Sequence, residues 1–78
     1  MSPKKWTQEM LYAVQSRHEE WLMEQPGVKG VGVASEGKGP LVLEVLTDHM
    51  EDAVRRTIQQ RLRGVPLQFI ETGPIEAF

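Results

Sequence analysis

The sequence predicts a small α+β protein, a two-layer sandwich in which two helices cover one face of a mainly antiparallel sheet. Apolar residues recur at helical spacing in two segments, while β-branched and aliphatic residues dominate three shorter segments. A single sheet with both helices on one face buries both apolar stripes. The predicted order is helix, strand, strand, helix, strand, over residues 7–24, 28–34, 41–47, 48–63 and 65–72.

The first helix is predicted from an apolar stripe in which Trp6, Met10, Val14 and Trp21 recur at helical spacing. Two starts fit the capping rules. Ser2 followed by Pro3 is one, and Thr7 between apolar flanking residues is the other. Proline and glycine at positions 26 and 27 end the helix after about residue 24.

The next two segments are predicted to form a β-hairpin. Residues 28–34 alternate with period two, and a second aliphatic run covers residues 41–47. The stretch GVASEGKG (32–39) also resembles a phosphate-binding loop. That loop needs a helix opening directly after its lysine, whereas Gly39 and Pro40 follow Lys38 here. We therefore interpret the stretch as a hairpin turn.

The second helix is predicted to begin at Asp48, because Asp48 and Glu51 approximate a capping box. Gly64 stands where a left-handed C-terminal cap is expected. In the strand that follows, Pro66 must lie at the strand start or at a sheet edge, since proline cannot donate to the ladder. A short fourth strand is expected in the tail, Ile75 to Phe78. The buried stripe of the helix comprises Met50, Ala53, Val54, Ile58 and Leu62.

Strand alternation assigns side chains to the two faces of the sheet. Placing Glu44 outward fixes the assignment for the second strand, and the same alternation is applied to the other two. The face toward the helices is predicted to hold Val31, Val33, Leu41, Leu43, Val45, Val65, Leu67 and Phe69. The opposite, open face is predicted to hold Gly30, Gly32, Val42, Leu46 and Ile70, which makes it the candidate interaction face.

The length and composition limit the organisation of the chain and its location. With 78 residues it can form one domain, residues 1–78, and no second core. The composition, 40% hydrophobic and 26% charged, is that of an ordinary globular protein. No apolar run approaches the roughly 18 residues of a membrane-spanning helix. We expect a cytoplasmic protein that has no membrane partner.

No reactive constellation assembles from the sequence. The chain has no cysteine, which excludes disulfides, thiolate catalysis and cysteine-ligated metal. The two histidines, His18 and His49, are not spaced as helical metal ligands, and no serine has a plausible base. We therefore expect no catalytic residues, no metal and no cofactor, and we expect that the protein is not an enzyme.

Three stretches resemble a small bacterial domain of uncharacterised role, found alone or ahead of trypsin-like peptidases. They are PGVKGVGV (26–33), PLVLEVLT (40–47) and RGVPLQFIETGPIEAF (63–78), and Leu67 stands where the family pattern has valine. The resemblance covers roughly the last two thirds of the chain. It implies a fold of the alpha-lytic-protease prodomain type, which related domains use for RNA binding and iron–sulphur scaffolding, but it implies no reaction.

Two functions follow as hypotheses. The first is a non-enzymatic interaction module whose open sheet face binds an unidentified protein partner or a second copy. The alternative is a nucleic-acid or phosphate-ligand binding module, although a net charge of −2 provides no global attraction to nucleic acid. Gly27 and Gly30 also match the Gly-x-x-Gly clamp of some RNA-binding domains. The basic residues of this alternative are Lys29, Lys38, Arg55, Arg56 and Arg63.

Overall fold

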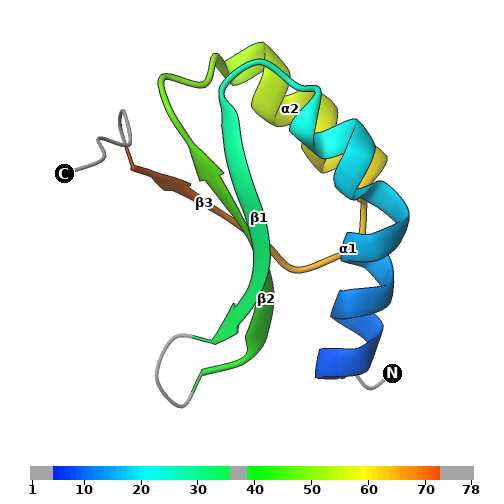
Figure 1. The fold of residues 1–78 in the computed structure, drawn as a ribbon. Helices are drawn as coiled ribbons and strands as arrows, with labels where there is room; N and C mark the ends of the chain where they lie inside the picture. Colours follow the sequence, from blue (N-terminus) through cyan, green and yellow to red (C-terminus); the bar gives the residue numbers. More distant parts are fainter. Residues whose placement is uncertain (1–4, 36–38, 73–78) are drawn as a thin grey trace, which may run out of the picture.

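The computed structural model describes residues 5–35 and 39–72. Two helices lie on the same side of a three-stranded sheet (Figure 1). The elements are α1 (Gln8–Met23), β1 (Val28–Ser35), β2 (Leu41–Thr47), α2 (Asp52–Arg61) and β3 (Leu67–Glu71). The predicted α+β class and the order α-β-β-α-β are confirmed. The fourth strand that we expected at residues 75–78 lies outside the described residues.

The sheet has the order β1-β2-β3 and is mixed. β1 pairs antiparallel with β2, which confirms the predicted hairpin, and β2 pairs parallel with β3. The antiparallel pairing that we expected to dominate therefore holds for one of the two strand pairs. The parallel pair arises because α2 carries the chain back across the sheet between β2 and β3.

Thr7 is the N-cap of α1, which begins at Gln8, so one of the two predicted starts is confirmed. The Thr7 hydroxyl accepts a hydrogen bond from the backbone N–H of Met10 at 3.2 Å. That bond satisfies one of the backbone donors that every helix leaves unpaired at its N-terminus. The alternative start at Pro3 is wrong, because residues 5–7 are not helical and Thr7 has an extended backbone.

The predicted start of the second helix at Asp48 is wrong, because α2 begins at Asp52 with Glu51 as its N-cap. Residues 48–50 form a tight connection in which His49 has a left-handed backbone, with φ of 54°. The N–H of Asp48 donates to the carbonyl of Gly27 at 2.8 Å. This tertiary bond and the left-handed residue prevent helix formation from starting at Asp48.

Both helices bury apolar side chains against the centre of the sheet. Five apolar side chains are fully buried at the middle of this core, namely Leu11, Leu22, Leu43, Val45 and Ile58. Burial of each such side chain contributes about 1.5–3 kcal/mol to stability. All eight residues that alternation assigned to the helix-facing side lie in this core or pack against it, so that prediction is confirmed.

α1 and β1 end within one residue of their predicted ends, whereas α2 ends at Arg61 and β3 begins at Leu67, each two residues inside its predicted bound. Gly64 has a left-handed backbone, with φ of 88°, in the turn that follows α2. β3 begins directly after Pro66, whose carbonyl accepts from the N–H of Leu43, and it forms one edge of the sheet. Neither helix in the described part of the chain has the length and hydropathy needed to cross a lipid bilayer.

Candidate functional site

The open face of the sheet is built by strand register. Pairing places Gly30 beside Leu46 and Leu46 beside Ile70, so these three residues form one row across all three strands. A Cβ added at Gly30 would lie 3.4 Å from the Leu46 Cδ1 atom, which places Leu46 on the side of the sheet to which a Gly30 side chain would project. Leu46 and Ile70 are half-buried and are not part of the helix-facing core.

Two further rows complete this face. Gly32 pairs with Glu44, which pairs in turn with Gln68, and Ala34 pairs with Val42. A Cβ at Gly32 would meet no atom within 4 Å, so the face is notched beside Glu44. The sequence-predicted residues are therefore brought to one surface. The row of Gly32, Glu44 and Gln68, here called the polar row, separates Val42 from the apolar row of Leu46 and Ile70.

The polar row is the part of this surface that we did not predict from the sequence. Alternation gave the outward direction of Glu44, but not which side chains lie next to it. Its neighbours Gly32 and Gln68 follow from the register of two strand pairs, one of them parallel. Among the described residues, no lysine or arginine forms an ion pair with Glu44. The open face therefore carries one half-buried carboxylate between two apolar rows.

The basic residues of the alternative hypothesis do not form one described patch. Arg55 lies over the Phe69 ring at 5.5 Å and pairs with Asp52 at 3.8 Å. Lys29 is the extra residue of a β-bulge in β1, while Arg56 and Arg63 are exposed in and after α2. Lys38 lies outside the described residues. Part of the basic set is thus engaged within the fold, so it offers a weaker phosphate-binding surface than its number suggests.

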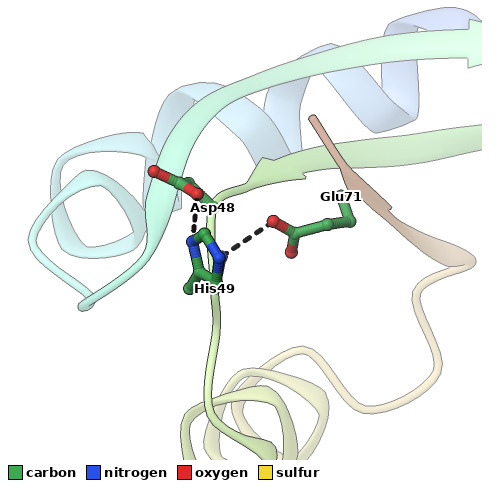
Figure 2. Close-up of side chains that lie close together, drawn as sticks. All are labelled: Asp48, His49 and Glu71. Carbon is green, nitrogen blue, oxygen red and sulfur yellow. Dashed lines mark hydrogen bonds and ion pairs between the residues drawn. The ribbon is translucent and has the colours of Figure 1, made fainter. Parts of the chain in front are cut away.

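A second cluster lies at the carboxyl ends of the parallel strands β2 and β3. Figure 2 shows Asp48, His49 and Glu71 converging there. The His49 ring nitrogen Nδ1 is 2.5 Å from an Asp48 carboxylate oxygen, and the His49 backbone N–H donates to Glu71 at 2.8 Å. The other Glu71 oxygen accepts from the buried Thr47 hydroxyl at 3.2 Å. The cluster fastens β3 to the connection between β2 and α2.

This cluster is the one group of potential metal ligands found in residues 5–35 and 39–72. Its ligand atoms lie within 4.8 Å of one another. One Asp48 oxygen already contacts the His49 ring, and both Glu71 oxygens accept hydrogen bonds. These groups satisfy one another and the donors of residues 47–49 without requiring an ion, which supports a structural role. Sequence reasoning missed the cluster because Glu71 and His49 are 22 positions apart.

The two segments that resemble phosphate-binding motifs do not adopt the backbone structures of those motifs. After the glycine-rich stretch the chain enters strand β2, where a phosphate-binding loop would open a helix. Gly27 sits in the turn before β1 and Gly30 lies within β1, so the Gly-x-x-Gly segment joins a turn to a strand. A Cβ at Gly27 would lie 3.0 Å from the Met50 Cα, so the connection at residues 48–50 packs closely against this turn.

Comparison with protein-family models finds no match, and comparison with curated proteins and with solved structures finds none at the significance required. The resemblance to the small bacterial domain remains an expectation drawn from its motifs.

Proposed function

We propose that the protein is a non-enzymatic interaction module whose open sheet face binds a short, basic, amphipathic segment of another protein. The supporting observation is the arrangement of that face. Glu44 has no cationic partner within the described residues, and it lies between the row of Leu46 and Ile70 and the row of Val42. A segment with Lys or Arg flanked by aliphatic side chains is complementary to this pattern in charge and polarity.

The size of the face favours a segment as the partner over a large folded surface. With strands about 4.8 Å apart and a rise of about 3.3 Å per residue, five residues on three strands cover roughly 240 Å². A standard protein interface buries about 800 Å² on each partner. A face of this size accommodates one strand or one helix, as in peptide recognition by grooves and sheets.

Face-to-face pairing of two copies is disfavoured by the same arrangement. Glu44 lies in the central row of the face, so stacking two such faces brings two carboxylates toward each other in a region that excludes water. Like charges in a desolvated interface cost several kcal/mol. A basic partner removes this penalty and gains an ion pair.

Selection from a display library of random peptides of about 12 residues tests the proposal, since such peptides span the face in extended form. Peptides enriched on the immobilised protein should carry Lys or Arg flanked by Leu, Ile, Val or Phe. Affinity for a selected peptide should fall at least about tenfold with Leu46→Asp. Gln59→Asp, at an exposed position on α2, is the matched control and should leave affinity unchanged.

Two variants separate the apolar and electrostatic parts of binding. Glu44→Lys leaves the apolar side chains intact and should abolish selection of basic peptides, while Glu44→Gln should weaken the preference for Lys and Arg. The proposal would be contradicted if selection on the natural protein enriched no peptides beyond those that the Leu46→Asp variant also retains. Binding that emerges only after removal of residues 73–78 would also contradict it, because that segment would then be the occupant of the face.

A further inference from the structure

The outer edge of β1 carries backbone groups directed away from the sheet. In β2, the N–H of Leu43 donates to Pro66 and the carbonyl of Thr47 accepts from Thr72, so these odd-numbered positions bond toward β3. The even-numbered positions of β2 therefore bond to Gly30, Gly32 and Ala34 of β1. This leaves the N–H and C=O groups of the alternate residues of β1, Val31 and Val33, pointing outward.

This outward edge is only partly occupied. The side-chain amide of Gln15, on α1, donates to the Val31 carbonyl at 3.1 Å. Among the described residues, no hydrogen bond reaches the outward N–H or C=O of Val33. The Gln15 Oε1 atom is buried beside this edge and also has no hydrogen-bond partner within the described residues. A strand added here would supply partners for the outward N–H and C=O of Val33.

The flank of α1 above this edge exposes two large hydrophobic side chains, with the carboxylate of Glu19 between them. Tyr12, Gln15, Glu19 and Met23 follow one another at spacings of three and four residues, so they share one flank of the helix. Tyr12 is 50% exposed and Met23 is 46% exposed, and these are the exposed large hydrophobic residues of the described chain. The opposite flank is already occupied, since Arg61 of α2 lies over Trp21.

The two edges of the sheet are protected to different degrees. β3 has five residues, starts after Pro66 and ends at Glu71, and a short strand with proline and charge at its ends resists pairing. β1 has eight residues, and from Gly30 to Ser35 it contains neither proline nor a charged side chain. The edge of β1 is therefore the one suited to accept another strand.

We propose that two copies of this chain associate through antiparallel pairing of their β1 edges, forming a continuous six-stranded sheet. A two-fold axis at Val33 pairs Val33 with the same residue of the second copy, and Val31 with Ser35 of the second copy. All of these positions direct backbone groups to this edge, and pairing at Val31 requires its carbonyl to exchange the Gln15 amide for a backbone N–H of the second copy. The pairing uses a different surface from the open face and leaves that face available in both copies.

The position of α1 fits this assembly. Paired edges place the two β1 strands about 4.8 Å apart and the two β2 strands about 14 Å apart. α1 packs mainly against β1 and less against β2. The distance between the two copies of α1 therefore falls between the β1 separation and the β2 separation. Packed helices are about 8–10 Å apart, which falls in that range. Since Gln15 reaches Val31, the axis at Val33 passes near the N-terminal half of α1, where the Tyr12 side chains of the two copies approach each other and bury part of their exposed area.

Sedimentation velocity over a range of protein concentrations tests the proposal. The natural chain should dimerise, and Val33→Pro should weaken dimerisation at least about tenfold, because proline at this position removes an outward N–H and spares the ladder to β2. Val33→Ala is the matched control, since it shortens the same side chain and retains the N–H. It should retain most of the dimer.

A second variant tests the helix flank independently of the strand. Tyr12→Glu should weaken the dimer, whereas Gln60→Glu, at an exposed position on α2, should not. A natural chain that stays monomeric at about 1 mM would overturn the proposal, as would equal dimerisation of the Val33→Pro and Val33→Ala variants. Leu46→Asp should leave the dimer intact, so loss of peptide binding and loss of dimerisation are distinguishable.

Discussion

At the scale of single residues, two glycines share one backbone conformation and differ in their surroundings. Gly27 and Gly64 both have φ of 88°, a region in which a side chain costs about 1–2 kcal/mol. A Cβ at Gly27 would also lie 3.0 Å from the Met50 Cα and 3.2 Å from the Asp48 carbonyl oxygen, whereas one at Gly64 would meet nothing within 4 Å. The two sites therefore separate conformational strain from steric overlap.

We predict that Gly64→Ala lowers the free energy of unfolding by about 1 kcal/mol. Gly27→Ala should cost at least about 1 kcal/mol more, because backbone atoms of residues 48–50 must move. Urea denaturation of both variants measures the difference. Equal losses would show that the contact between Gly27 and the connection before α2 contributes nothing to stability.

At the scale of elements, one cation joins the last turn of α2 to α1. The Arg61 guanidinium lies 4.6 Å from the Trp21 ring centroid. Within residues 5–35 and 39–72, no ion pair joins an arginine to Glu20 or Glu24, the carboxylates at this end of α1. Arg61 instead places positive charge near the C-terminal end of α1, where the helix dipole favours it.

Replacing Arg61 tests the contribution of this contact. Arg61→Gln should lower the free energy of unfolding by about 0.5–1 kcal/mol, the range for an exposed cation–π pair, and should change the tryptophan fluorescence. Arg56→Gln removes the same charge from an exposed position on the same helix and should be nearly neutral. If both variants lose the same stability, net charge rather than the ring contact is responsible.

The elements also show which features local sequence can specify. Alternation predicted β2 at residues 41–47 and sorted the side chains of all three strands correctly, because burial on one face constrains every second residue. The start of α2 was missed because Gly27 and Glu71 hold the connection at 48–50, and both are distant in sequence. The polar row of Glu44 was missed for the same reason, since register depends on partners.

At the scale of the whole molecule, association should contribute to stability. A 78-residue domain buries a smaller share of its surface than larger domains do and is correspondingly marginal. A dimer links folding to concentration, because only the folded chain pairs. The proposed assembly therefore makes a prediction about thermal stability that does not require knowledge of the segment bound at the open face.

We predict that the thermal midpoint of the natural chain rises with protein concentration once the dimer dominates. Each tenfold increase stabilises a folded chain by about 0.7 kcal/mol, half the free-energy change per dimer, which corresponds to about 4 °C for this length. Differential scanning calorimetry at several concentrations measures the slope. Val33→Pro should shift the onset of this dependence to a concentration at least about tenfold higher, while Leu46→Asp should retain the slope at the natural onset even if its midpoint is lower. A flat midpoint for the natural chain would contradict pairing through β1, and a flat midpoint for Leu46→Asp alone would assign association to the open face.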